Sequence, residues 1–418
     1  MTLYAGLDVS LALTSICIVD AEGVVVRESK VSSEPEAICS ALGPYADRLH
    51  RIGLEAGPLS QHLYSAMVEA GLPTICVEVR HMARVLRAQT ANKTDRNDAR
   101  GIAQMMRAGI FKVVHVKTER SQRLKVLLSV RKVLKSKLLD IEADLRGVLK
   151  NFGLKLGKVT VRDFEARVRE LASFDPFIAV VVEPALAARR ALREQYDQLH
   201  RMLLDVARKD DVCRRLMTMP GVGPVVALNY RVAIDIPNRF VKSRTVGAHI
   251  GLTPMRYQSG EVDWTGRISK FGDPMARASL YEAAQVLLTR TARHSGLRSW
   301  AMRIAKRRGR KRAVVALARK MGVILHRMWV DETDFRWDVQ PARPKAAQVP
   351  QTADRCPARD DGAGKAGLSN DWRGSRSAKS HYRSGLPSLS DPSMWRLDAD
   401  REEKHEPERD ETTRRKME

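Results

Sequence analysis

The first part of the chain alternates short apolar runs with amphipathic stretches, a pattern that predicts strands and helices in turn. The run Leu3–Val9 and the strand-like Thr14–Val19 come first, and a turn at Asp20–Gly23 separates them from Val24–Val26. Such closely spaced strands favour antiparallel hairpins. The later elements are predicted as a helix at Pro35–Leu42, a strand at Arg51–Glu55, a helix at Leu59–Ala70 ended by Gly71, and a strand at Thr74–Val79. We therefore expect residues 1–115 to form an α/β domain with a mixed sheet.

Helical repeats replace this pattern over residues 116–210. Apolar residues recur at intervals of three and four, interrupted at Arg131, at Leu124, Leu127, Leu134, Leu138, Ile141, Leu145 and Val148. A second stretch has the same spacing at Leu192, Tyr196, Leu199, Leu203 and Val206. Two heptad-like helices predict a helical hairpin or coiled coil with the stripes as its core, joined by a poorly defined loop over 151–183. Such elements act as spacers or join subunits, so we expect a homo-oligomer and not a monomer.

Residues 211–338 are predicted to be mainly helical. They open with a tight turn at Met219–Pro224, which resembles a helix-hairpin-helix turn that holds a phosphate and equally fits a plain turn between helices. The middle, Gly251–Gly272, is rich in glycine and polar residues. Residues 339–418 contain clustered proline and serine with few aliphatic residues, which predicts a disordered tail. This tail is either an appended binding segment or a fortuitous extension of the reading frame.

Positive charge is concentrated in the part of the chain that precedes this tail. The 418 residues include 73 Lys and Arg against 49 Asp and Glu, a net charge of +24, of which +22 belongs to residues 1–340. An excess of this size predicts a polyanionic partner and argues against an enzyme of small neutral metabolites. The stretch Arg290–Arg327 has 13 basic residues and no acid. We predict nucleic-acid contacts at its centre, by Lys306, Arg307, Arg308, Arg310, Lys311 and Arg312; the alternative is a solvated helix face.

Other sequence signals point to a soluble protein of a reducing compartment. No apolar run approaches the roughly 18–20 residues of a membrane span, and the N-terminus lacks the pattern of a signal peptide. The five cysteines form no CxxC pair, which argues against a disulfide framework and against a cysteine-type zinc site. We expect a cytoplasmic protein with no membrane contact.

Four acidic residues occupy positions that suit catalysis. Asp8 lies at the end of the first predicted strand and Glu55 at the end of the fourth, while Asp95 and Asp98 open a helix with Thr94 as its predicted N-cap. The i, i+3 spacing places both aspartates on one helical face. Converging carboxylates repel one another unless cations neutralise them, and carboxylate oxygens favour Mg²⁺ or Mn²⁺. Each acid alone fits a structural role at a turn or in the first turn of a helix. The ordered set in a basic protein instead predicts a metal site for phosphoryl transfer, with all four as catalytic ligands.

At these acids the sequence resembles the DEDD-type transposases of the insertion sequence 110 family. Four later segments match further family patterns in the same order: Pro220–Gly223 (Pro-Gly-x-Gly), Ala248–Pro254 (Ala-x-x-Gly-Leu-Thr-Pro), Arg256–Gly260 (Arg-Tyr-x-Ser-Gly) and Ile268–Gly272 (Ser-Lys-x-Gly). The resemblance covers roughly residues 3–335. It implies an RNase H-like, RuvC-like N-terminal domain over 1–115, a helical coiled-coil domain over 116–210 and a mainly helical transposase domain over 211–338.

The resemblance also implies a mechanism and partners. Ser259 would be the nucleophile that attacks a DNA phosphate and forms a covalent phosphoserine link, assisted by metals on the four carboxylates. The family is linked to a structured bridge RNA that pairs with donor and target DNA, and to a tetrameric protein. For this chain it therefore implies DNA and a guide RNA as partners, in a prokaryotic cytoplasm and associated with the nucleoid.

The residues around Ser259 leave several roles open. Without the family, Ser259 fits a turn position in a polar loop, since no neighbouring His–Asp pair activates it. Tyr257 is a rival nucleophile or a residue that stacks on a base, and Trp264 fits either the core or base stacking. His249 fits a buried position better than that of a ligand. The cations predicted to clamp the phosphate, with generic surface charge as the alternative, are Arg256, Arg267, Lys270 and Arg277.

Two other functions remain in competition with transposition through phosphoserine. The first is a nuclease of the Holliday-junction resolvase type, in which Asp8, Glu55, Asp95 and Asp98 activate water and Ser259 is dispensable. The second is a non-catalytic nucleic-acid-binding scaffold built on the basic region, for which Asp8→Ala would leave every activity unchanged. The order of the four acids favours an enzyme over this scaffold.

Overall fold

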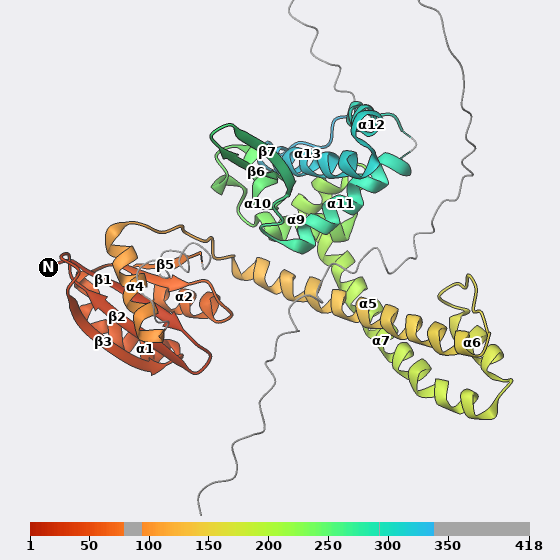
Figure 1. Ribbon diagram of the computed structural model, residues 1–418, viewed down its shortest axis with the longest axis horizontal. Coiled ribbons are helices and arrows are strands. Elements are labelled where there is room, and N and C mark those ends of the chain that lie inside the picture. Colours follow the sequence, from red (N-terminus) through yellow and green to blue (C-terminus); the bar gives the residue numbers. More distant parts are fainter. Residues whose placement is uncertain (79–93, 292, 338–418) are drawn as a thin grey trace, which may run out of the picture. The chain divides into compact units, whose positions relative to one another are not determined.

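The N-terminal part of the protein contains a five-stranded sheet (Figure 1). The computed structural model describes residues 1–78, 94–291 and 293–337 of the chain. The strands of the sheet are β1 (Leu3–Val9), β2 (Leu13–Val19), β3 (Val25–Ser32), β4 (Leu49–Glu55) and β5 (Thr74–Val77). They lie in the order β3-β2-β1-β4-β5. As predicted, β1, β2 and β3 pair antiparallel, while β4 runs parallel to β1 and β5 runs parallel to β4. The predicted mixed sheet is confirmed, and its strand order is that of an RNase H-like fold.

Helices cover both faces of this sheet. The segment between β3 and β4 contains α1 (Pro35–Leu42) and the short 3-10 helix η1 (Gly43–Arg48), and α2 (Ser60–Glu69) connects β4 to β5. Leu7 and Leu54 pack with α1 and α2 in one core and are fully buried, each burial stabilising the fold by about 2 kcal/mol. The helix α4 (Asp95–Ala108) packs against β1 and β2 on the other face. Neighbouring residues of a strand point to opposite faces, so each strand contributes to both layers.

Two long helices, α5 (Glu119–Asn151) and α7 (Pro176–Lys209), follow and pack against each other. The predicted loop over 151–183 is wrong in part, because it contains α6 (Phe164–Ala172) and the first turns of α7. The apolar stripe of α5 also departs from the prediction at its end, where Leu149 is fully buried and Val148 is 39% exposed. The spacing of four between Leu145 and Leu149 keeps the apolar stripe on one face of a straight helix. A strict heptad repeat would instead place Val148 in the stripe. Coiled-coil packing stays a prediction.

Polar contacts replace apolar ones where the stripe of α5 is interrupted. The guanidinium of Arg131 donates to the hydroxyl of Tyr196 on α7 at 2.6 Å and lies 4.8 Å from the centre of its ring. Near the other end of the pair, buried Arg189 binds Glu142 and Glu165 and lies over the ring of Phe164. These contacts join the helices at positions where hydrophobic spacing gives no signal.

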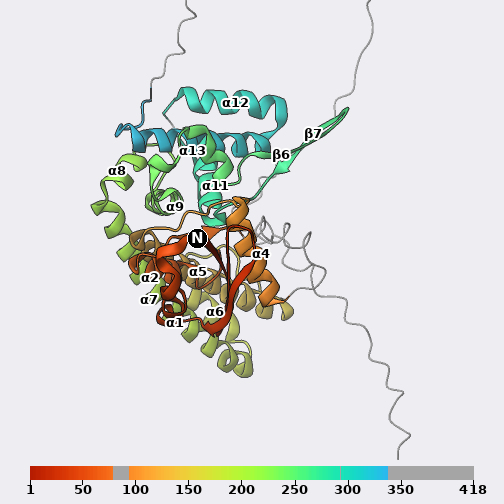
Figure 2. The ribbon, with the colours of Figure 1, turned by 90° about the vertical axis from the view of Figure 1, so that its left-hand side faces the viewer.

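The C-terminal part is mainly helical, as predicted, with one hairpin of strands. Its elements are α8 (Asp211–Met217), α9 (Pro224–Ile234), η2 (Pro237–Arg239), η3 (Ser243–Thr245), α10 (Val246–His249), β6 (Pro254–Ser259), β7 (Val262–Ile268), α11 (Pro274–Thr289), α12 (Gly296–Arg308) and α13 (Arg310–Val330). Helices α9, α11 and α13 share a core that includes Tyr230, Leu280 and Leu317. Figure 2 shows the hairpin β6–β7 extending away from these helices.

Asp235 attaches the beginning of α5 to the end of α9. Its carboxylate accepts hydrogen bonds from Ser121 Oγ and from the backbone and hydroxyl of Thr118, and lies 2.7 Å from His115 Nε2. Burial opposes ionisation, but these hydrogen bonds outweigh it and lower the pKa of Asp235 to about 2. Asp235 adopts a φ of 61°, which is unfavourable for a residue with a side chain. The hydrogen bonds compensate for this backbone conformation.

The structure bears on two simpler predictions, while a third falls outside its described residues. Among the helices of the described residues, none combines the length and apolar character needed to cross a membrane. The four cysteines in the described part of the chain are free, and three of them are buried. The predicted disordered tail, 339–418, lies outside the described residues.

Candidate active site

Asp8 and Glu55 lie side by side on neighbouring strands. Leu7 of β1 is in register with Leu54 of β4, so the next residue of each parallel strand, Asp8 and Glu55, continues the same pairing. Both acids are half-buried. The sheet therefore brings together two acids that are far apart in the sequence.

Two glycines show which face of the sheet these acids share. A Cβ atom at Gly6 would lie 2.3 Å from the backbone of Ala99 and Ala103, and one at Gly53 would lie 2.7 Å from Ile102. The face of Gly6 and Gly53 is therefore the face that α4 covers. Side chains two residues apart on a strand point to the same side. Asp8 and Glu55, two residues beyond these glycines, belong to the α4 face.

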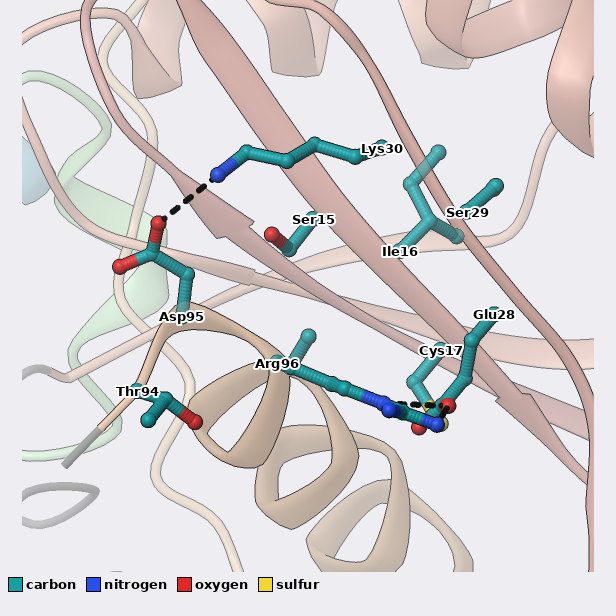
Figure 3. A pocket seen from close by; sticks show the side chains of 10 residues that line it. Ser15, Ile16, Cys17, Glu28, Ser29, Lys30, Thr94, Asp95 and Arg96 are labelled. Atoms are coloured by element: carbon teal, nitrogen blue, oxygen red, sulfur yellow. Dashed lines mark hydrogen bonds and ion pairs between the residues drawn. The ribbon is translucent and has the colours of Figure 1, made fainter. Parts of the chain in front are cut away.

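The first turn of α4 contains the other two predicted ligands. The Thr94 hydroxyl accepts a hydrogen bond from the Asn97 amide, which confirms the predicted N-cap. Asp95 is exposed, and its carboxylate lies 3.2 Å from Lys30 Nζ of β3 (Figure 3). Asp98 is half-buried, one turn before the Ala103 backbone that covers Gly6. Contact between Gly6 and α4 thus sets how the first turn of α4 lies over β1.

Register aligns a row of polar residues across this face of the sheet. Lys30 of β3 pairs with Ser15 of β2, and Ser15 pairs with Asp8 of β1, next to Glu55 of β4. Lys30 and Ser15 are not predicted from the sequence, because nothing local to either residue distinguishes it from an ordinary strand residue. What places Lys30 and Ser15 in a row with Asp8 is the register of three strands, which the sequence does not show directly.

Glu28, two residues before Lys30 on β3, forms a second charged contact with α4. It pairs with Arg96 and Arg100, and Figure 3 shows Arg96 reaching Glu28 beside Cys17. The hydrogen bond from Arg96 holds the pKa of Glu28 below its usual value. Burial raises the pKa of Cys17 to about 11, so this thiol stays protonated near neutral pH and is no nucleophile. Lys30, Arg96 and Asp95 line a hollow of about 500 Å³ here.

The oxygen donors of this face suit a hard divalent cation, since carboxylates are the preferred ligands of Mg²⁺ and Mn²⁺. Within the described residues, however, no three His, Cys, Asp or Glu side chains stand close enough together to hold a metal ion. Asp95 points to Lys30 in this arrangement. Binding a cation with all four acids would require Asp95 to exchange this ion pair for the metal.

Ser259 ends the first strand of the hairpin, which corrects the expectation of an irregular polar loop. Ser259 pairs with Val262 across a two-residue turn that begins at Gly260, where φ is 54°. A detectable signal was the alternation of apolar residues on either side of this glycine-bearing turn. All six residues of β6 are exposed. The structure therefore presents the serine on a surface hairpin of the C-terminal part.

Two glycines of the family motifs, Gly251 and Gly272, allow the backbone segments at the base of this hairpin to cross closely. A Cβ atom at Gly272 would lie 1.8 Å from the carbonyl oxygen of His249, and one at Gly251 would lie 2.0 Å from that of Phe271. The two backbone segments cross too closely for any side chain. Arg277, predicted to clamp a phosphate, donates to the carbonyl oxygens of Ile250 and Phe271 and so supports this crossing.

The other predicted phosphate contacts differ in how their charge is balanced. Arg256 donates to Asp263 across the hairpin at 2.8 Å. Arg267 and Lys270 are exposed and have no ion-pair partner in the part of the chain that the structure describes. The central basic residues Lys306, Arg307, Arg308, Arg310, Lys311 and Arg312 are all exposed around the break between α12 and α13 at Gly309. Three cations in the first turn of α13 oppose its dipole, a cost that a bound anion would remove.

The remaining candidates have structural surroundings. Gly221 in the Met219–Pro224 turn packs against the Ala283 backbone of α11, where a Cβ atom would lie 2.4 Å from its oxygen. Burial lowers the pKa of His249 to about 4, and its Nε2 lies 2.9 Å from Arg239. Trp264 is 53% exposed, so it is no core residue.

Comparison with known proteins agrees with this geometry. A sequence model described as "Transposase", of the DEDD type, matches residues 5–153, and a model described as "Transposase IS116/IS110/IS902 family" matches residues 213–299. Together they cover more than half of the chain and contain all four acids and Ser259. The chain belongs to the IS110 family of transposases. The resemblance inferred from the motifs is thereby confirmed.

Curated relatives of this transposase come from several bacteria. The transposase for insertion sequence element IS1111A of Coxiella burnetii is 28% identical over 344 residues, which are 79% of this chain and 90% of that protein. The transposase for element IS1328 of Yersinia enterocolitica is 27% identical, covering 58% and 72% of the two chains. Among solved structures, RuvC of T. thermophilus in complex with a Holliday junction substrate matches 27% of this chain and 100% of its own, with 15% identity and a TM-score of 0.20.

Proposed function

We propose that this transposase cuts and rejoins the DNA of a mobile element through a covalent phosphoserine intermediate at Ser259. Asp8, Glu55, Asp95 and Asp98 would hold divalent cations, Mg²⁺ or Mn²⁺. Donor and target DNA are the substrates, and a structured RNA selects them. The observation that carries the proposal is that Asp8 and Glu55 directly follow the paired Leu7 and Leu54 of two parallel strands, on the sheet face that α4 covers.

The proposed metal site draws on three elements. Asp8 and Glu55 lie on adjacent strands, and Asp95 and Asp98 lie in the first turn of a helix on the same face. Bound cations would neutralise the phosphate charge and assist the attacking and leaving oxygens. Lys30 offers a positive charge beside Asp95 when no cation is bound there. The carboxylates thus avoid part of their mutual repulsion before metal and DNA arrive.

In the proposed reaction, the covalent phosphoserine link keeps the energy of the cleaved phosphodiester bond for the later joining step. Ser259 Oγ forms a bond to phosphorus as its proton passes to solvent, and the bond from phosphorus to a deoxyribose oxygen breaks. The leaving oxygen takes up a proton. A hydroxyl at the end of another strand then attacks the phosphoserine, which restores the serine and joins the two DNA strands. Exposure of Ser259 on a hairpin supports this role, because a duplex can approach the hydroxyl without displacing the core.

Three further parts of the proposal rest on the family and on charge. The exposed cations from Lys306 to Arg312 would bind nucleic-acid backbone, which includes that of the guide RNA. The long helices α5 and α7 would join subunits of a dimer or tetramer through coiled-coil packing. The active site would combine carboxylates and serine from the two parts of the fold within that assembly.

The test is a search for the covalent protein–DNA link. The full-length protein is incubated with Mg²⁺, a plasmid that carries the DNA on both sides of its gene, and RNA transcribed from that DNA. Trypsin releases the peptide Tyr257–Arg267, which contains one serine. We expect a nucleotide on Ser259 in this peptide, loss of the adduct in Ser259→Ala, and its retention in Tyr257→Phe.

Two outcomes would contradict this function. Metal-dependent cleavage of the plasmid by Ser259→Ala at the wild-type rate would show that water is the nucleophile, as in a resolvase-type nuclease. A nucleotide on Tyr257 would show a tyrosine mechanism instead. Replacing Ser269, at the base of the hairpin, with alanine is the matched control and should leave the adduct in place.

A further inference from the structure

The two faces of the hairpin β6–β7 differ in chemical character. Pairing sets Tyr257 opposite Trp264 and Ser259 opposite Val262, and these four side chains share one face because strand residues alternate. The other face contains Arg256, Gln258, Asp263 and Thr265, with an ion pair between Arg256 and Asp263. Ser259 is therefore the polar residue of a face that is otherwise aromatic and apolar.

The aromatic pair is both ordered and exposed. The ring centres of Tyr257 and Trp264 lie 6.1 Å apart with 27° between their planes. A Cβ atom at Gly266 would lie 2.7 Å from Cζ3 of Trp264, so the indole packs over the bare backbone of this glycine. Even so, Tyr257 and Trp264 remain 54% and 53% exposed. Large apolar side chains gathered on one exposed face are typical of a binding surface.

Charge and position favour a nucleobase as the occupant of this face. The nearby cations Arg267 and Lys270 have no ion-pair partner within the described residues, and Arg256 already neutralises Asp263. Two residues along a strand span about 7 Å. Tyr257 and Ser259 are therefore separated along β6 by roughly the length of one nucleotide unit. A flat ring pair beside a phosphate-directed serine fits a base that is stacked out of its duplex.

We propose that Tyr257 and Trp264 form a stacking platform for an unpaired base of the DNA strand that Ser259 attacks. The platform would hold the neighbouring phosphate at the Ser259 hydroxyl and would favour DNA that is locally unpaired. This inference rests on the proposed function of Ser259, which it deepens by naming how the strand is positioned.

Binding of single-stranded DNA tests the platform without any chemistry. The probe is a fluorescein-labelled 20-nucleotide strand of mixed sequence, compared with the duplex of the same sequence. We expect Trp264→Ala to bind the single strand about 10-fold more weakly, and Trp264→Phe to bind it within about 3-fold of the wild type. Dependence of the affinity on salt should not change, because stacking releases no counterions.

Two variants serve as controls for this measurement. Phe177→Ala removes an aromatic side chain that is 71% exposed on α7, and it should bind the single strand like the wild type. Ser269→Ala, which removes a hydroxyl at the base of the hairpin, should also bind normally, because this side chain is not part of the platform. Circular dichroism melting curves show whether each variant is folded, and Trp264→Phe keeps the test valid if Trp264→Ala is not.

The outcomes separate this inference from the proposed function. Wild-type affinity of folded Trp264→Ala for the single strand would overturn the platform, even if the adduct on Ser259 is found. A change of oligomeric state in Trp264→Ala without a change in DNA affinity would show a protein interface and would also overturn it. Full adduct formation by Ser259→Ala, with a 10-fold loss of strand affinity in Trp264→Ala, would overturn the serine mechanism and leave the platform in place.

Discussion

The carboxylates and the serine of this transposase are supported in different ways. Asp8 lies on the central strand of a five-stranded sheet and Glu55 on the strand next to it, with helices packed on both faces of the sheet. Ser259 lies on a two-stranded hairpin whose first strand is exposed throughout. A hairpin of two strands has little stability of its own in water. The proposed metal ligands therefore lie where packing fixes their geometry, while the proposed nucleophile lies where bound DNA can help to order its support.

Electrostatic balance also differs between the two regions. Acids near the sheet site have basic partners across the interface between α4 and β3, as Asp95 has in Lys30 and Glu28 has in Arg96 and Arg100. On the hairpin, Arg256 pairs with Asp263, and the neighbouring cations Arg267 and Lys270 have no ion-pair partner among the described residues. This contrast supports the proposal that the sheet site binds cations and that the hairpin binds the phosphate backbone.

Removing a carboxylate from the sheet site should have the largest effect. We expect Asp8→Asn to lower DNA cleavage by about 1000-fold or more, since a lost ligand weakens cation binding and several kcal/mol of charge stabilisation depend on the cation. Its melting temperature should stay close to that of the wild type, because asparagine has the same shape. Cleavage is measured at several Mg²⁺ concentrations. Asp47→Asn, at an exposed position of η1, is the control, and a loss of less than about 10-fold in Asp8→Asn would rule out this face as the metal site.

Substituting alanine for a glycine in each region tests how rigid the sheet and the hairpin are. Gly6→Ala places a Cβ atom 2.3 Å from the α4 backbone, and we expect a loss of about 1–3 kcal/mol in unfolding free energy together with cleavage activity. At Gly260 no atom lies within 4 Å, and the cost comes from its φ of 54°, about 1 kcal/mol confined to the hairpin. Chemical denaturation measures the first effect, and hydrogen exchange of the β6 and β7 amides measures the second. Equal global destabilisation by both substitutions would remove the contrast between the regions.

Lys30→Met should have the smallest effect. Its ion pair with Asp95 is more than half exposed on both sides, so we expect almost no change in stability. Without this competing positive charge, the Mg²⁺ concentration for half-maximal cleavage should fall by up to about 5-fold. A metal titration of cleavage measures this shift, with Lys112→Met as the control because Lys112 pairs with Glu78 elsewhere in the chain. A higher Mg²⁺ requirement in Lys30→Met would show that Lys30 assists the site and does not compete with the cation.

Sequence patterns predicted most of the sheet and its covering helices because those elements depend on local spacing. Pro35–Leu42 was predicted to the residue, and the capping role of Thr94 is confirmed. The hairpin was missed, since polar and glycine-rich composition hid a short alternation around Gly260. The sequence predicts a loop over 151–183 and does not reveal α6, because this helix is short and its apolar residues pack against other helices.

By itself, the sequence determined the periodicity of the elements, the excess of positive charge, the order of the four acids and the family to which the chain belongs. These properties reside in neighbouring residues or in composition. Only the tertiary structure decided that Lys30 meets Asp95, 65 residues away, that Gly6 and Gly53 seat α4, and that Ser259 shares a face with Tyr257 and Trp264. Strand register decides such neighbours, and a shift of one residue would turn every side chain to the opposite face. Register follows from the packing of the whole sheet, which no local stretch of sequence contains.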